Sequence, residues 1–475
     1  MDTRKLLERS DSLWELPSRG DMRVPVRLHA SRALLQQMDG KALEQAIRVA
    51  RLPGVVEAVH VMPDGQAGYG FPNGSVAAFD PQRGVVAVGG LGTDLSAGMR
   101  CLHTGLRRAD ILPRQGPLAD ALQAQLPVET GGPVVIELSR GQLHDMLSGG
   151  AQWAVEHDWG DRSDLDRIED HGRVPMALPA VVSDRLRQRL RTERVAPDGT
   201  DHLLEVQAVS AVCEPAIARA FGLAEGDIVV TLHGGSRGLA ALIDADYRQE
   251  MVEAAPARGR QPKDPELACA PIGSELGQQY LGAMRAAMNC ALANRQILTH
   301  RVRQVFRRLF PKAALPLLYD VSHNSCKLEK HRVGGQLRTL HVHRSGAARA
   351  LGPGHPDLPQ ALRHAGQPVL VGGPVGAASY LLAGVQAGVP GAFGSACCGS
   401  SRAIGRHPAA SPWQGRHIAD ALAARGVLVR CATDRGLADE APDEGRGLEA
   451  LVDAAAAAGL ARKVARLDPL ICIRG

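Results

Sequence analysis

The sequence predicts an α+β fold, arranged as one large interwoven domain over residues 1–475. Helix-like and strand-like runs both occur along the chain. No internal repeat, low-complexity linker or clear domain boundary separates them. Polar side chains that suit a single binding site are spread from residue 94 to residue 323, so distant parts of the chain are expected to meet in one unit.

The first half of the chain begins with a helical pattern over residues 31–52. Strand-like runs bounded by glycine and proline turns come next. These runs cover 55–62, 76–80 and 84–90, and further helical patterns cover 143–157 and 182–194.

The second half contains a long amphipathic pattern over residues 274–310, which predicts a helix. Its basic end, 301–310, is typical of a solvated helix face, with contact to nucleic acid as the alternative. The alanine-rich tail from about 415 to 465 is also predicted to be helical, with a role in packing alone.

Composition limits the class of protein. A hydrophobic content of 45% is ample for a core, although aromatic residues make up only 3%. The net charge of +5 is weaker than that of proteins that bind nucleic acid by charge alone, yet it allows a local phosphate-binding groove.

The nine cysteines are scattered and odd in number, so they do not form a disulfide framework and favour a reducing compartment. The N-terminal segment has no apolar signal region, and no stretch has the roughly 18–20 apolar residues of a membrane span. We therefore expect a soluble cytoplasmic protein with no membrane partner.

Three histidines, His202, His233 and His323, lie where an apolar run meets a polar turn, and Asp94 lies in the same setting. Imidazole with carboxylate is a ligand set that suits Mn²⁺, Fe²⁺ or Zn²⁺. These four residues are predicted to form one metal centre. The alternative is that each histidine is structural, with hydrogen-bond partners of its own, and that Asp94 caps a turn.

Four glycine-rich segments, 233–238, 343–350, 366–379 and 394–402, add hydroxyl, cationic or thiol groups. Successive backbone N–H groups in such loops form nests for anions. Together with the arginines inside them, they favour a ligand that carries phosphate, although glycine–serine loops are also common connectors. None of them matches a P-loop or a dinucleotide-binding fingerprint. The arginines are Arg237, Arg344 and Arg402.

Ordered motifs over nearly the whole chain resemble the RtcB family of RNA-splicing ligases. The matching stretches are MPDGQAGYGFPNGSVAAFD (62–80), GGLGTDLSAGMR (89–100), DHLLEVQ (201–207), LHGGSRGL (232–239), SHNSCKLEKH (322–331), HRSGAARA (343–350), GQPVLVGGPVGAASYLLAG (366–384), GSACCGSSR (394–402) and DPLICIRG (468–475). The resemblance implies the α+β fold of that family and two Mn²⁺ ions. It also implies ligation of RNA ends that carry a 2′,3′-cyclic phosphate or 3′-phosphate to 5′-hydroxyl ends, with GTP as cofactor and a guanylylated histidine as intermediate.

The resemblance assigns site residues by position. Asp94 and His202 would hold one metal ion, and His233 and His323 the other. Cys398 stands at the position of the nucleophilic histidine. The nucleotide-binding positions are Asp201, His202, Leu203, Leu204, Glu205, His323, Asn324, Gly372, Gly373, Pro374, Val375, Ser379, Cys398, Gly399, Ser400, Ser401 and Arg474, and the substrate-binding positions are Arg237, Arg344 and Arg402.

Several positions depart from the family pattern. Ala97 replaces a cysteine that bridges both metal ions, and Cys398 replaces the histidine nucleophile. Arg474 replaces a lysine that reads guanine, Asp201 an asparagine, and Ser345 a lysine, whereas the guanine-reading acid is kept as Glu205.

Three roles remain open for Cys398. A thiolate can act as the nucleophile, can bind metal in place of the missing cysteine, or can be idle. We expect nearby metal ions and arginines to lower its pKa.

The leading functional hypothesis is an RNA ligase of the RtcB type with RNA ends as its partner. One alternative is an altered paralogue that binds or hydrolyses terminal phosphates of RNA without guanylylation. The other is an RNA-binding protein without catalysis.

Overall fold

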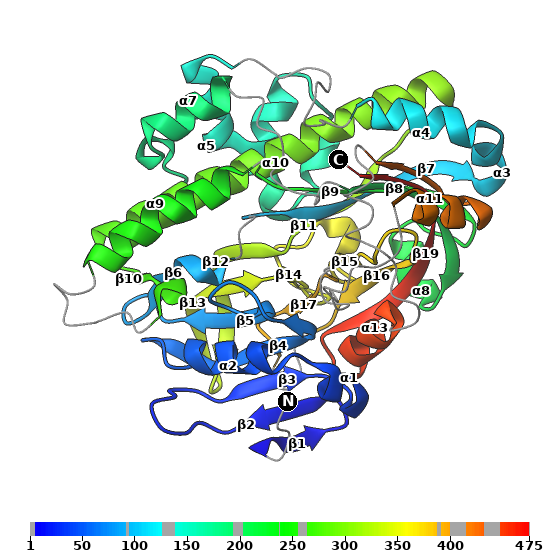
Figure 1. Ribbon diagram of the computed structural model, residues 1–475. Coiled ribbons are helices and arrows are strands. Elements are labelled where there is room, and N and C mark those ends of the chain that lie inside the picture. Colours follow the sequence, from blue (N-terminus) through cyan, green and yellow to red (C-terminus); the bar gives the residue numbers. More distant parts are fainter. Residues whose placement is uncertain are drawn as a thin grey trace.

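Two large β-sheets form the centre of the structure (Figure 1). The computed structural model describes residues 5–91, 95–125, 138–192, 203–236, 238–254, 264–386, 391–399, 415–431 and 447–474. Within these residues the first sheet joins, in spatial order, β1 (Leu7–Ser10), β2 (Leu13–Leu16), β3 (Val26–His29), β4 (Val55–Gln66), β5 (Asn73–Phe79), β13 (Gln336–Ser345) and β12 (Asn324–Val333).

The second sheet supplies most of the candidate site. In spatial order it joins β11 (Leu317–Ser322), β7 (Gly98–Arg107), β9 (Asp227–Gly234), β8 (Leu203–Val212), β19 (Ala461–Arg474), β16 (Ser379–Gly384) and β15 (Pro368–Val371), with β18 (Leu428–Cys431) parallel to β19. Two short pairs flank the sheets: β10 (Cys269–Pro271) with β6 (Val85–Ala87), and β14 (Ala347–Arg349) with β17 (Ser395–Cys397). His323 is the single residue between β11 and β12, where the chain passes from the second sheet to the first.

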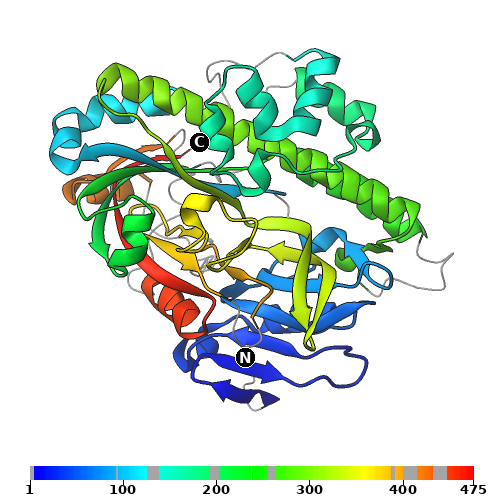
Figure 2. The same cartoon turned by 180° about the vertical axis from the view of Figure 1, so that it is seen from behind.

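A long helix, α10 (Glu275–Leu309), crosses the face of the second sheet that points away from the first sheet (Figures 1 and 2). The hydroxyl of Ser274 caps its N-terminus by accepting a hydrogen bond from the N–H of Gly277 at 3.1 Å. Most of its side chains are buried, because α5 and α9 cover its other side.

The other α-helices are α1 (Arg32–Gln37), α2 (Gly40–Val49), α3 (Arg108–Ile111), α4 (Gln115–Gln123), α5 (Arg140–Glu156), α6 (Arg162–Leu165), α7 (Asp184–Thr192), α8 (Pro215–Ala220), α9 (Leu239–Ala254), α11 (Gly415–Ala424) and α13 (Leu448–Ala457). Short 3₁₀ turns occur at Val88–Gly90, Leu112–Arg114, Glu169–Gly172, Pro179–Val181, Pro265–Leu267 and Gln360–Leu362. No helix among the described residues combines the length and the apolar character needed to span a bilayer.

The mixture of helices and sheets agrees with the predicted α+β class, and the three strands expected near the N-terminus are confirmed as β4, β5 and β6. The helix expected over 31–52 is instead two helices, because Asp39 begins a new one. Its carboxylate caps α2 by accepting a hydrogen bond from the N–H of Lys41 at 2.9 Å.

The prediction of a helical tail was wrong in part. Among the tail residues that the structure describes, α11 and α13 are helical, whereas β18 and β19 are strands. The residues of β19 before Pro469 have good helix propensity, but they pair with β8 on one side and β16 on the other. Burial between two strands outweighs a local preference of a few tenths of a kcal/mol per residue.

The basic end of α10 is only partly the solvated face that was predicted. Arg307 and Arg308 are exposed. Arg303 is buried, and its guanidinium pairs with both carboxylate oxygens of Asp164 at 2.6 and 2.7 Å. A helix periodicity cannot reveal a partner that is more than a hundred residues away.

Candidate metal and nucleotide site

The register of the second sheet brings predicted metal-binding and nucleotide-binding residues onto one face. Met99 on β7, His233 on β9, Leu203 on β8 and Arg474 on β19 lie directly opposite one another in a row. Opposite residues of an antiparallel ladder project to the same face, as do residues two positions along a strand. Glu205, two residues after Leu203, therefore shares the face of His233 and Arg474.

A hydrogen-bond network links the predicted guanine-reading acid to another nucleotide-binding position. The side-chain amide of Gln207 donates to Glu205 Oε2 at 2.7 Å and to Ser379 Oγ at 2.9 Å. Its carbonyl oxygen accepts from the hydroxyl of Thr231 at 3.1 Å. Gln207 was not among the predicted site residues, although its spacing of two from Glu205 along a strand was a usable signal.

His233 and His323 meet at the end of this face. Their Nε2 atoms lie 3.2 Å apart. Their rings are stacked, with 5.0 Å between centroids and an angle of 6° between planes. Burial, followed by the neighbouring His233 and Arg295, lowers the pKa of His323 well below 6.5. The His323 ring is therefore neutral at pH 7, the form that binds metal.

The distance between the two Nε2 atoms suits ligands of one divalent cation. Two imidazole nitrogens that bind one ion tetrahedrally at about 2.0–2.1 Å are separated by about 3.3 Å, close to the spacing found here. In the part of the chain that the structure describes, no cluster of three histidine, cysteine or acidic residues suited to a metal occurs. The remaining predicted ligands, Asp94 and His202, lie outside the described residues.

Two hydrogen bonds through Gly346 connect Cys398 to Asn324, the residue that follows His323. Its thiol donates to the carbonyl oxygen of Gly346 at 3.1 Å. The N–H of Gly346 donates to Oδ1 of Asn324, the residue after His323, at 2.7 Å. The predicted nucleophile position is thus tied to the backbone next to a predicted metal ligand.

The surroundings of Cys398 oppose its ionisation. The residue is buried, and burial, then Asp64, then Cys397 raise the pKa of its thiol well above the usual value. Burial likewise raises the pKa of Asp64 to about 6, although the N–H of Gly399 donates to its Oδ2 at 3.0 Å. The expectation of a lowered thiol pKa is therefore not met by the described residues.

The predicted nucleotide-binding loops touch each other through glycines. The N–H of Gly372 donates to the carbonyl oxygen of Cys398 at 3.3 Å. A Cβ at Gly399 would lie 2.5 Å from the oxygen of Gly372, and Gly399 has a positive φ of 62°. Only glycine allows this approach without strain. Gly373, Pro374 and Val375 continue the same loop into β16.

Arg344, a predicted substrate-binding residue, is held by protein partners. Its buried guanidinium forms a two-pronged ion pair with Glu329, at 2.6 and 2.9 Å, and donates to Ser395 Oγ at 2.8 Å. The other predicted residues of the site, Asp201, Arg237, Ser400, Ser401 and Arg402, lie outside the described residues.

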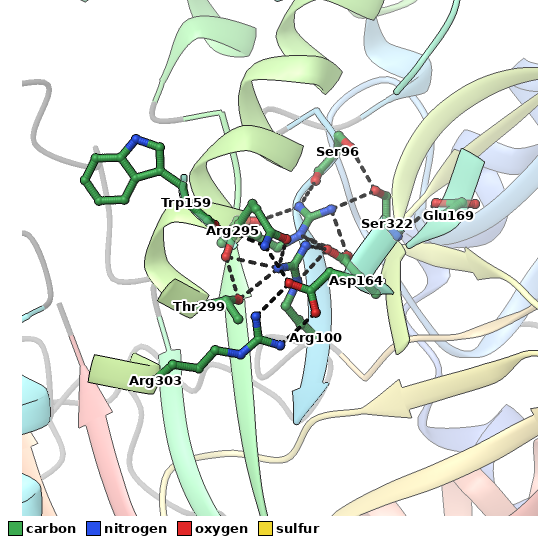
Figure 3. Close-up of polar contacts among 12 residues, drawn as sticks. Ser96, Arg100, Trp159, Asp164, Glu169, Arg295, Thr299, Arg303 and Ser322 are labelled. Carbon is green, nitrogen blue, oxygen red and sulfur yellow. Dashed lines mark hydrogen bonds and ion pairs between the residues drawn. The ribbon is translucent and has the colours of Figure 1, made fainter. Parts of the chain in front are cut away.

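A buried ion-pair network lies on the opposite face of the second sheet, under α10 (Figure 3). Asp320 on β11 pairs with Arg100 on β7 and with Arg295 on α10, and all three side chains are fully buried. Burial alone would raise the pKa of Asp320, but the two guanidinium groups outweigh it and hold the pKa below the usual value. No local sequence pattern predicts this network, since its members are far apart along the chain.

Comparisons with known proteins identify the family. A family model described as tRNA-splicing ligase RtcB matches residues 45–475. The chain is 42% identical to the tRNA-splicing ligase RtcB of Thermococcus kodakarensis over 99% of both chains. It is 39% identical to that of Archaeoglobus fulgidus over 98% of both chains. It is also 45% identical to the RNA-splicing ligase RtcB of Mycobacterium bovis, over 91% of this chain and 100% of the relative. At these identities and lengths, the chain belongs to the RtcB family of tRNA-splicing ligases.

Proposed function

We propose that this protein is an RNA ligase that joins 2′,3′-cyclic phosphate or 3′-phosphate RNA ends to 5′-hydroxyl ends, with GTP and Mn²⁺ as cofactors. The observation that carries the proposal is the convergence of His233 and His323, with 3.2 Å between their Nε2 atoms, on the sheet face that also bears Glu205 and Arg474. The two histidines would bind the metal, and Glu205 and Arg474 would bind the base. This arrangement suits a nucleotide whose phosphates lie next to the metal.

Different residues of the chain would bind the metal, the base and the phosphates. His233 and His323 would hold Mn²⁺, which when bound supplies positive charge to phosphate oxygens. Glu205 and Arg474 would contact the guanine, with Gln207 fixing the orientation of Glu205 through their 2.7 Å hydrogen bond. The glycine loop at Gly372 would offer backbone N–H groups to phosphate.

Cys398 would accept the GMP group in this scheme. Its sulfur would attack the α-phosphorus of GTP, the bond to pyrophosphate would break, and the thiol proton must leave. The Asp64 carboxylate would accept this proton, because its pKa of about 6 leaves it largely ionised at neutral pH and its Oδ2 accepts the N–H of Gly399, the residue after Cys398, at 3.0 Å.

A second candidate function is favoured by the same residue. The raised pKa of Cys398 keeps its thiol protonated, and Ala97 offers no thiolate to a metal. A protein of this kind would bind or hydrolyse the terminal phosphate of RNA without a covalent intermediate.

The deciding experiment is incubation of the purified protein with GTP labelled at the α-phosphate and with Mn²⁺. Retention of label after denaturation, followed by its transfer to RNA with a 3′-phosphate, supports the ligase. Release of phosphate from RNA ends without labelled protein supports the second candidate. Retention of RNA with neither reaction identifies a binding protein.

Restoring the missing thiol at position 97 is expected to strengthen Mn²⁺ binding. The carbonyl oxygen of Ala97 accepts the N–H of His323 at 2.9 Å, so this position adjoins the predicted metal ligand. Ala97→Cys should lower the Mn²⁺ dissociation constant about tenfold, which corresponds to about 1.4 kcal/mol. Calorimetric titration measures it, with the buried helix position Ala151→Cys as control. An unchanged constant at position 97 would argue against a bridging role there.

A further inference from the structure

One side chain on α10 contacts the described segments that adjoin three of the four predicted metal ligands (Figure 3). Nη1 of Arg295 donates to the carbonyl oxygens of Ser96, at 2.6 Å, and of Gly234, at 2.9 Å. Its Nη2 donates to Ser322 Oγ at 3.3 Å. The predicted ligands within two residues of these acceptors are Asp94, His233 and His323.

The buried carboxylate of Asp320 fixes the guanidinium of Arg295. Nε of Arg295 donates to both oxygens of Asp320, at 3.0 and 3.1 Å. Arg100 approaches Asp320 from the other side, with Nε and Nη2 at 2.8 and 2.6 Å from Oδ2. A planar group with its donors in a fixed fork, packed against a buried carboxylate, has little freedom to turn.

The three segments also bond to one another at this point. The hydroxyls of Ser96 and Ser322 lie 2.8 Å apart. The N–H of His323 donates to the oxygen of Ala97 at 2.9 Å, and the N–H of Ser96 donates to the oxygen of Asn324 at 2.8 Å. These loops are therefore in contact, and Arg295 is the side chain that joins both of them to the end of β9.

We propose that Arg295 is a positioning residue that holds these three segments in register and thereby sets the geometry of the metal ligands beside them. The part that concerns metal rests on the proposed function. Residues that orient metal ligands from behind affect affinity strongly, and their loss typically costs about 10–100-fold.

The test compares Arg295→Lys with Arg100→Lys in the full chain. Both substitutions keep a buried positive charge near Asp320 and remove one planar guanidinium group. Arg100 is a matched control, because its Nη1 donates to Gln296 Oε1 at 2.7 Å and Thr299 Oγ1 at 2.9 Å, both on α10, and not to a ligand-bearing segment. Mn²⁺ affinity is measured from the electron paramagnetic resonance signal of free Mn²⁺. Hydrogen exchange of the Ser96 and His323 amides reports on the segments without metal.

For Arg295→Lys we expect Mn²⁺ binding about 10–100-fold weaker and faster exchange of both amides. Arg100→Lys should have a smaller effect in both measurements, because Arg100 supports the Arg295 guanidinium through Asp320. Faster exchange in Arg295→Lys alone, in a protein whose wild-type form binds no Mn²⁺, supports the positioning role and refutes the metal part of the proposed function. Equal effects of the two substitutions, or none, overturn the proposal.

A milder variant covers the case in which Arg295→Lys does not fold. Ser322→Ala removes one of the three acceptors and leaves the buried charges in place. It should weaken Mn²⁺ binding and speed exchange of the His323 amide in the same direction. Wild-type values in that variant, beside an unfolded Arg295→Lys, would assign Arg295 to stability alone.

Discussion

Replacing His323 by alanine is expected to remove the Mn²⁺ ion that it would share with His233 and, with it, any reaction of GTP. A direct metal ligand should cost more than the roughly 100-fold upper limit seen for residues that only support a ligand. The backbone at this position should persist, because the N–H of residue 323 is bonded to Ala97 and its carbonyl oxygen accepts from Ala347 at 2.9 Å. Neither bond needs the imidazole.

The measurement is a Mn²⁺ titration together with a thermal unfolding curve. His233→Ala should give the same loss, since the two Nε2 atoms are only 3.2 Å apart and would share one ion. His144→Ala is the control, because His144 is exposed on α5. Full Mn²⁺ affinity in His323→Ala, with an unchanged unfolding temperature, would remove His323 from the metal centre.

The histidine pair could be predicted from the sequence, whereas Arg295, the residue proposed to position it, could not. His233 and His323 stand at strand ends, and a strand end next to a polar turn is recognisable in a single segment. Arg295 sits in the middle of a long helix, where an arginine ordinarily faces solvent. Its burial depends on Asp320, which the chain supplies from another element, so no local pattern reveals it.

The face proposed to bind guanine could likewise be predicted only in part. Glu205 and Arg474 were predicted from motifs, but their shared face depends on the pairing of β8 with β19. Part of β19 was predicted as helix, because alanine, arginine and lysine favour helices in isolation. The register that places Arg474 opposite Leu203 depends on tertiary structure. The motifs indicate it only because they resemble those of a known family.

The protein partners of Arg344 could not be predicted from its own segment. An arginine in a glycine-containing segment suggests a phosphate contact, yet the guanidinium is buried against Glu329. Residues 344 and 329 lie on the same face of a hairpin but are four positions apart in its register, since Ser325 is opposite Arg344 and Leu340 is opposite Glu329. A carboxylate fifteen residues earlier was visible in the sequence, but its pairing depended on the hairpin register.

Converting position 398 to histidine, together with Ala97→Cys, is expected to produce a protein that is covalently labelled by GTP. The Cys398 thiol is mostly protonated at neutral pH because its pKa is raised. A neutral imidazole needs no ionisation to attack phosphorus. Asp64 would favour the new group, since its Oδ1 is buried and has no hydrogen-bond partner among the described residues. An imidazole N–H could donate to that oxygen and so orient the ring.

One single variant separates the three possible roles of the native thiol. Cys398→Ser abolishes labelling if the thiolate is the nucleophile, lowers Mn²⁺ affinity if it is a ligand, and changes neither if it is idle. Asp64→Asn in the double variant should reduce labelling, because an amide orients and stabilises the imidazolium less well than a carboxylate. Each is read by retention of α-labelled GMP after denaturation and by Mn²⁺ titration.

Overpacking is the main risk of the double variant, because a larger ring in a buried site typically costs about 1–3 kcal/mol. A thermal unfolding curve therefore accompanies each labelling experiment. In a folded double variant that binds Mn²⁺, both substituted catalytic positions are restored and the carboxylate beside residue 398 is in place. If such a protein still carries no GMP, the remaining departures, at Asp201, Ser345 and Arg474, have already disabled the chemistry. The ligase proposal should then give way to a protein that binds or hydrolyses terminal phosphates of RNA.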